Sequence, residues 1–335
     1  MRYFNWLNKI QKLIRPASPA LMYHRISNCC VDPWQLTVSP VHFEQQLQIL
    51  HKTGRVKSLS HFQSSFETNY DIRPFILLTF DDGYIDNFMH VKPLLEKYEL
   101  PATFFIPSKY MGQDREYWWD ELAFIFLEKK VLPPFLTIII GEHLKQYDLK
   151  GEIHINTSLM KLHTAWNANL NPPSKRAQVY LAIWKMLSPL PFNHQEDIMA
   201  QIRTWAEVDA IPREGYRVMS ADQVNQLAKI DLFSIGAHTH SHPALPEHSK
   251  EFQAEEMVKN KEALQKLTGT DVESLAYPSG LYNDVSIGVA KSLGFKLAFT
   301  TNSQPLNCSP GPYQLGRYPV YDWSGARFSK QIKQY

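Results

Sequence analysis

Two acidic residues directly follow a continuous apolar run in this sequence. The run is FILLTF at residues 75–80, and Asp81, Asp82 and Gly83 come immediately after it. Adjacent carboxylates raise each other's pKa unless water or a cation partners them, so this pair beside a buried strand indicates a cation site. Asp and Gly are also common at helix caps and turns, and that explanation would suffice for an isolated motif.

Histidines cluster after a second apolar segment. Three of the 13 histidines, His238, His240 and His242, fall within five residues directly after residues 233–237. His238 and His242 are four residues apart, so both imidazoles converge on one ion if the chain turns there. One carboxylate and two imidazoles suit Zn²⁺ or another borderline divalent metal, with a position left for water. A polar surface loop rich in histidine is the alternative.

The two motifs together resemble those of the polysaccharide deacetylase family, carbohydrate esterase family 4, where TFDDG precedes H-[ST]-x-x-H-P. The resemblance covers roughly residues 20–110 and 217–323 and leaves the segment between them unexplained. It implies a distorted (β/α)₇ barrel that removes acetyl groups from N-acetylated sugars with a bound divalent metal. Carried over by position, it makes Asp81 the catalytic base and Asp82, His238 and His242 the metal ligands. Zn²⁺ is the expected metal, with Co²⁺ or Mn²⁺ as alternatives.

The third motif departs from the family pattern. It usually begins with an arginine that orients the base, and Ala276 stands at the matching place here. Tyr277 and Pro278 follow, and we predict that they bind substrate, with the backbone N–H of Tyr277 as a donor to an oxyanion. Arg317 is a candidate replacement for the missing arginine, although the sequence alone does not place it near Asp81.

The general acid of the family also has no counterpart at its usual place in this chain. The family usually supplies a histidine near its C-terminus, and this chain has no histidine after His248. The sequence MYHR at residues 22–25 resembles the N-terminal Tyr-His of circularly permuted members that deacetylate biofilm polysaccharides. His24 is therefore the predicted acid, with a purely structural histidine as the alternative. The metal would polarise the acetamide carbonyl and acidify a water, Asp81 would take the water proton, and His24 would protonate the leaving amine.

Short apolar strands alternate with helical segments on both sides of these motifs. We expect strands at residues 20–26, 75–80, 102–106, 233–237, 274–277 and 297–301, and helices at residues 39–53, 91–98, 220–229, 251–267 and 284–293. This alternation predicts an α/β fold whose parallel strands form a distorted (β/α)₇ TIM-like barrel. In such folds the carboxyl ends of the strands carry the site.

The alternation of strands and helices stops between about residues 111 and 215. The sequence there is rich in helical patterns and is interrupted by proline pairs at 133–134 and 172–173. The predicted organisation is a basic N-terminal helix at 1–18, a barrel at 19–110 and 216–325, and a largely helical insertion at 111–215. Trp118 and Trp119 open the insertion. We predict that they bind substrate as platforms for sugar rings, with core packing as the alternative.

Composition excludes several classes of protein. The 335 residues are 44% hydrophobic and 20% charged, which is enough to bury a core. A balance of 35 basic against 33 acidic residues argues against nucleic-acid binding. Three cysteines, two of them adjacent, do not form a disulfide framework. No apolar run approaches the ~18 residues of a spanning helix, and no secretory signal is evident, so we expect a cytoplasmic protein.

The first 31 residues carry five Lys or Arg and no acid. Tyr3, Leu7, Ile10 and Ile14 recur at helical spacing, which predicts a basic amphipathic helix. Such a helix either packs on its own domain or makes peripheral contact with the anionic inner face of a membrane.

Three functions are compatible with these features. The leading hypothesis is a metal-dependent deacetylase of an N-acetylated sugar or glycan, acting in the synthesis of a surface polysaccharide or a lipid-linked precursor. The second is a catalytically inactive glycan-binding protein on the same barrel, which Ala276 supports. The third is an amidohydrolase-type metalloenzyme using His238-Thr239-His240, but that site needs histidines later in the chain than His248.

Overall fold

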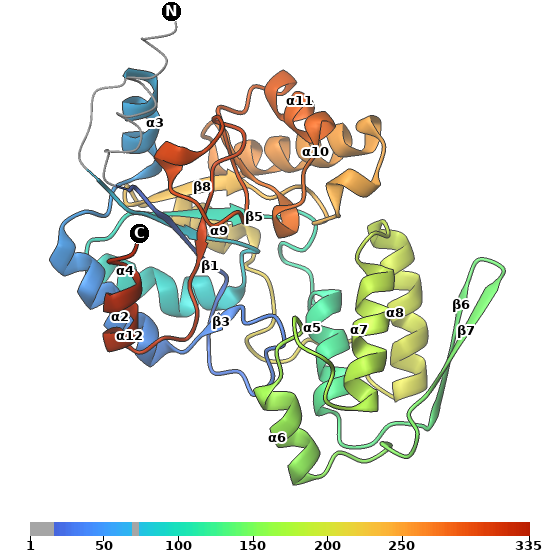
Figure 1. The fold of residues 1–335 in the computed structure, drawn as a ribbon. Helices are drawn as coiled ribbons and strands as arrows, with labels where there is room; N and C mark the ends of the chain where they lie inside the picture. Colours follow the sequence, from blue (N-terminus) through green and yellow to red (C-terminus); the bar gives the residue numbers. More distant parts are fainter. Residues whose placement is uncertain (1–16, 69–73) are drawn as a thin grey trace, which may run out of the picture.

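A single parallel sheet forms the centre of the protein. The computed structural model describes residues 17–68 and 74–335, and Figure 1 shows the sheet curled with helices around it. In the described residues the strand order is β10-β9-β8-β5-β4-β1-β11, and every pairing in this sheet is parallel. The strands are β1 (Ala20–Tyr23), β4 (Leu77–Phe80), β5 (Ala102–Ile106), β8 (Phe233–Ala237), β9 (Ser274–Ala276), β10 (Leu297–Phe299) and β11 (Tyr318–Pro319). The predicted (β/α)₇ type of fold is confirmed.

The segment that includes β11 links the two edges of the sheet. Leu315 forms an isolated parallel bridge with Phe299 of β10, and Tyr318 then pairs with Leu21 of β1. Between these contacts lies Gly316, where a Cβ atom would approach the backbone oxygen of residue 302 to 2.7 Å. Only glycine tolerates such a close approach. This crossing buries the next residue, Arg317, completely.

Helices and short turns connect the strands of the barrel. The helices predicted at 39–53, 220–229, 251–267 and 284–293 are confirmed to within two residues at each end. Ser39 and Ser220 cap two of them through their side chains, as their positions in the sequence indicate. The elements are α2 (Pro40–Thr53), α3 (Leu59–Thr68), η1 (Asn87–Val91), α4 (Lys92–Lys97), α9 (Ala221–Ala228), η3 (Leu245–Glu247), α10 (Lys250–Thr268), η4 (Pro278–Gly280), α11 (Asp284–Ser292), η5 (Leu306–Cys308) and α12 (Gly325–Gln331).

The core lies on both faces of the sheet, because all the residues of β1, β4 and β5 are buried. Tyr23, Phe80 and Phe104 stack in neighbouring strands with ring centroids 5.2 Å apart. Burial on both faces explains why these strands read as continuous apolar runs rather than alternating ones. A small two-stranded sheet, β2 (Arg25–Ile26) with β3 (Thr37–Val38), lies just beyond β1.

The segment between β5 and β8 forms a separate layer beside the barrel (Figure 1). Its own hydrophobic cluster supports the predicted insertion, whose boundaries at 111 and 215 stay a prediction. One antiparallel hairpin, β6–β7, interrupts the helices expected there. Exposed and buried side chains alternate along β6, which is typical of a strand with one face against the core. The elements are α5 (Trp118–Ala123), η2 (Phe124–Glu128), β6 (Phe135–Ile140), β7 (His143–Asp148), α6 (Thr157–Ala165), α7 (Lys175–Leu187) and α8 (Phe192–Ala206).

The predicted N-terminal helix at 1–18 lies almost entirely outside the described residues, which begin at residue 17. Its contact with a membrane therefore stays a prediction. Within the described ranges, every helix is too short or too polar to cross a bilayer.

Candidate metal centre and active site

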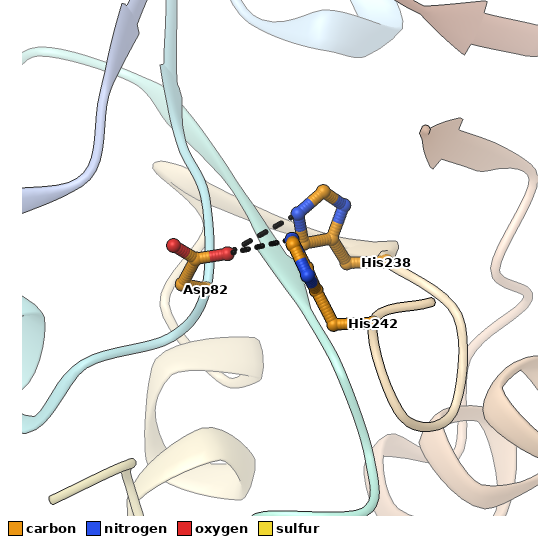
Figure 2. A group of neighbouring side chains, drawn as sticks. All are labelled: Asp82, His238 and His242. Atoms are coloured by element: carbon orange, nitrogen blue, oxygen red, sulfur yellow. Dashed lines mark ion pairs between the residues drawn. The ribbon is translucent and has the colours of Figure 1, made fainter. Parts of the chain in front are cut away.

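Three predicted ligands meet at one edge of the sheet. Asp82 follows β4, and His238 and His242 follow β8; both strands are parallel neighbours of β5, so their carboxyl ends share an edge. Figure 2 shows the three side chains pointing toward one another. Oδ1 of Asp82 lies 3.3 Å from Nε2 of His238 and 3.4 Å from Nε2 of His242. The structure therefore brings together the three residues that the two motifs predicted.

The donor set fits a divalent cation. Oδ1 of Asp82 is buried and accepts no hydrogen bond from the described residues, an expensive state for a carboxylate oxygen. Two imidazole nitrogens face this oxygen, and the three ligand atoms all lie within 4.8 Å of one another. Ligands held tetrahedrally about 2.0–2.1 Å from zinc lie about 3.3–3.4 Å apart, which is the spacing of both histidines from Asp82. A metal at this point would satisfy the orphaned oxygen.

The surroundings of the cluster set its protonation. Nδ1 of His238 donates to the carbonyl of Ala276 at 2.8 Å, so in the neutral ring Nε2 carries no proton and its lone pair faces Asp82. Burial lowers the pKa of His242 to about 4, so this ring is neutral at pH 7. Burial alone would raise the pKa of Asp82, but the neighbouring imidazoles of His238 and His242 lower it. An ionised carboxylate beside a neutral imidazole is the state that binds a metal.

Helix α10 holds the histidine loop through two side chains one turn apart. Asn260 accepts from the backbone N–H of His238 at 2.8 Å and donates to the carbonyl of Ile106 at 3.0 Å. Glu256 accepts from the N–H and the hydroxyl of Ser241, both at 2.7 Å. Neither residue is predicted by the sequence motifs. Polar side chains spaced four apart on the buried face of a helix were the available signal.

The predicted base, Asp81, is paired with Arg317. Nη1 and Nη2 of Arg317 each donate to one oxygen of the Asp81 carboxylate at 2.7 Å, and both side chains are almost fully buried. Nε of Arg317 donates to the carbonyl of Thr300 at 3.0 Å, which fixes the plane of the guanidinium. Burial would raise the pKa of Asp81, but the charge of Arg317 lowers it. Arg317 thus occupies the position that its proposed orienting role requires.

His24 follows β1, the neighbour of β4 in the sheet. The N–H of Asp81 donates to the carbonyl of Tyr23 at 3.0 Å, which ties the ends of the two strands together. The lowered pKa of Asp81 and of Asp82 is due in part to the electrostatic influence of His24. His24 is partly exposed, and its backbone carbonyl accepts from Nδ2 of Asn87 at 2.9 Å. This placement agrees with the predicted acid, whose role stays a prediction.

The predicted oxyanion donor is wrong in one respect. The N–H of Tyr277 already donates to the carbonyl of Phe299 at 3.0 Å, because the β9–β10 ladder extends one residue past the strand. Tyr277 and Pro278 are both buried, so their contact with substrate stays a prediction. Ser279 comes next, is exposed and has a φ of 53°, and its N–H makes no backbone hydrogen bond within the described residues. Ser279 is therefore a better candidate than Tyr277.

The two tryptophans that open the insertion are more than nine-tenths buried. Trp118 packs in the hydrophobic cluster of the insertion, against Trp184. Trp119 lies with its ring centroid 4.9 Å from that of His242, so it borders the metal centre. Both tryptophans therefore pack in the protein interior. Contact between a sugar and the small exposed part of either ring stays a prediction.

The sequence profile of the polysaccharide deacetylase family matches residues 69–128 and 136–298, about two-thirds of the chain. The chain belongs to this family, as its motifs predicted. The YxkH protein of Bacillus subtilis (strain 168) is 37% identical over 105 residues, which cover 30% of this chain. The match spans only 36% of that relative's own length.

Solved structures show the same fold. The Streptococcus pyogenes deacetylase PplD, in complex with acetate, superposes with a TM-score of 0.58 at 20% identity, covering 94% of this chain and 98% of PplD. IcaB from Ammonifex degensii superposes with a TM-score of 0.55 at 16% identity, covering 95% of this chain and 96% of IcaB. The family supports a deacetylase hydrolase activity.

Proposed function

We propose that this protein is a metal-dependent deacetylase that removes an acetyl group from an N-acetylated sugar or glycan. One observation carries the proposal: the orphaned oxygen of Asp82 and two imidazole nitrogens converge beside a second carboxylate, Asp81, that an arginine holds ionised. Zn²⁺ is the metal that this donor set favours.

Each residue then has a role that follows from its position. Asp82, His238 and His242 would hold the cation, which supplies polarisation of the acetamide carbonyl and activation of water when bound. Asp81 accepts the proton of the attacking water, because its lowered pKa keeps it ionised at neutral pH. Arg317 keeps both carboxylate oxygens of Asp81 in one orientation through its two hydrogen bonds.

Two further groups of the protein would act on charges that develop on the substrate during the reaction. His24 would donate a proton to the departing amine, which is otherwise a poor leaving group. The N–H of Ser279 is our candidate donor to the oxyanion, in the turn after β9, whose last residue, Ala276, accepts the hydrogen bond from His238. A preorganised donor of this kind contributes about 3 kcal/mol to transition-state stabilisation.

The two alternative functions lose their support. The inactive glycan-binding hypothesis rested on Ala276, but Arg317, just before β11, provides the guanidinium that is missing there. The amidohydrolase hypothesis needs His240 in the cluster. Nδ1 of His240 instead pairs with the hydroxyl of Ser108 at 2.8 Å, and its ring is not among the three converging ligands.

The cellular setting is part of the proposal. Described cysteines are all unpaired, which agrees with the expected reducing, cytoplasmic compartment. An enzyme on that side would meet a nucleotide- or lipid-linked precursor of a surface polysaccharide rather than the finished polymer. An N-terminal basic helix that contacts the inner membrane face would favour the lipid-linked form.

Acetate release tests this function. Purified protein would be assayed on a panel of N-acetylhexosamine-containing substrates with Zn²⁺, Co²⁺ or a chelator, beside Asp82→Ala. We expect metal-dependent acetate release that disappears in the variant. Tight metal binding without acetate from any substrate would return weight to the glycan-binding hypothesis. A protein that binds no metal would refute the assignment of the cluster.

A further inference from the structure

The backbone at two of the metal ligands is unusual. Asp82 has a φ of 70° and His242 a φ of 59°, so both non-glycine residues adopt the left-handed conformation. This conformation costs free energy for a residue with a Cβ atom, and it persists where surrounding contacts enforce it. Side chains from outside the barrel contact both of these residues.

Tyr117 holds the backbone of the first ligand. It immediately precedes α5, the first helix of the insertion, and its side chain is fully buried. Its hydroxyl donates to the backbone carbonyl of Asp82 at 2.5 Å. A hydrogen bond to this carbonyl restricts rotation of the peptide that follows Asp82, so it stabilises the turn that aims the carboxylate at the histidines.

Trp119 packs against the second ligand. Its ring centroid is 4.9 Å from that of His242, and it also stacks on Tyr117, 4.2 Å away with an interplanar angle of 9°. Its indole N–H donates to the hydroxyl of Tyr84 at 3.0 Å, and that hydroxyl donates to Asp120 at 2.7 Å. The indole plane is thus fixed on one edge by hydrogen bonds and on one face by a stacked ring.

We propose that Tyr117 and Trp119 are positioning residues of the metal centre, through which the insertion sets the affinity of the site for its metal. The inference rests on the proposed metal centre and extends it to residues outside the family motifs. Neither residue is a ligand. Tyr117 acts on the backbone of Asp82, and Trp119 acts on the ring of His242. Trp119 thereby has a structural reason to be buried that differs from contact with a sugar.

Metal affinity is the readout, measured on the full-length protein. Zn²⁺ dissociation constants come from competition with a chromophoric chelator, and Co²⁺ binding is followed by its visible absorption. Since residues that orient metal ligands typically contribute about 10–100-fold to affinity, we expect Tyr117→Phe and Trp119→Phe each to weaken Zn²⁺ binding by about 10-fold or more.

Two matched variants control for a general loss of packing. Tyr180→Phe removes a fully buried hydroxyl of the insertion that accepts from Trp34 at 2.8 Å. Trp166→Phe removes an equally buried indole whose N–H donates to the carbonyl of Leu170 at 3.3 Å. We expect wild-type metal affinity in both, with urea unfolding midpoints recorded for all four variants.

The outcomes separate this inference from the proposed function. Wild-type affinity in Tyr117→Phe or in Trp119→Phe would overturn the role assigned to that residue. Equal weakening in the control variants would overturn the inference as a whole, since the effect would then follow any loss of packing in the insertion. A wild-type protein that binds neither Zn²⁺ nor Co²⁺ would instead refute the metal centre itself.

Discussion

Replacing Arg317 tests the assignment of Asp81 as the base. Arg317→Met replaces the guanidinium side chain with an unbranched apolar one. The change removes two hydrogen bonds of 2.7 Å from the carboxylate of Asp81, which is 2% exposed. Breaking a buried ion pair from one side costs about 3–5 kcal/mol of stability, because the remaining charge stays buried. Losing an oriented general base lowers turnover by about 10²–10⁴-fold.

The pH dependence gives the sharper test. In the wild type Arg317 lowers the pKa of Asp81, so the ion pair stabilises the fold above the carboxyl's ordinary pKa and is lost as the pH falls. In the variant, burial raises the pKa of Asp81 instead. The acidic limb of kcat/KM must therefore move to higher pH. The loss of folding stability relative to wild type must also grow as the pH rises from about 3 to about 7.

The assay is kcat/KM for acetate release between pH 4 and 9, together with urea unfolding at three pH values. Arg176→Met is the matched control. Arg176 is also fully buried, but its guanidinium donates to three backbone carbonyls of the insertion. It should lose stability without a shift of the acidic limb. An acidic limb that stays in place in Arg317→Met, with turnover near wild type, would refute the assignment of Asp81 as the base.

Three further predictions concern single side chains. Asp82→Ala should abolish stoichiometric Zn²⁺ binding by metal analysis, and retained binding would contradict its role as a ligand. His24→Gln should keep Zn²⁺ content but lower kcat by about 10²-fold or more, and unchanged turnover would remove His24 as the acid. Burial raises the pKa of Asp120 to about 7, so its ionisation destabilises the fold increasingly between about pH 4 and 7. Asp120→Asn should therefore gain stability in urea unfolding at pH 8 but not at pH 4, and a gain independent of pH would contradict this account.

Strand positions and the ligand set followed from local pattern. The run at 75–80 contains β4, and the segments at 102–106 and 233–237 coincide with β5 and β8. These strands are buried on both faces or nearly so, which produces short continuous apolar runs that stand out from helical periodicity. Two motifs placed directly after such strands were enough to predict that their side chains would meet.

Other features had no local signal. β11 is two residues long, too short for a recognisable pattern, and the hairpin β6–β7 lies in a segment read as helical. The N–H of Tyr277 was misjudged because a ladder with β10 extends past the last strand residue. Hydrogen-bond partners of this kind depend on the register between segments, which no single segment encodes.

The sequence by itself determined the parallel barrel, the edge at which the candidate site lies and the three candidate metal ligands, because neighbouring parallel strands end on the same side. Only the tertiary structure decided which groups support them. Arg317 reaches Asp81 across 236 residues because Gly316 lets the closing segment pass between β10 and β1. Tyr117 reaches Asp82 because the insertion packs over the ends of the strands. Both contacts depend on the distance between backbones that are remote in sequence, and that distance is set by packing rather than by local pattern.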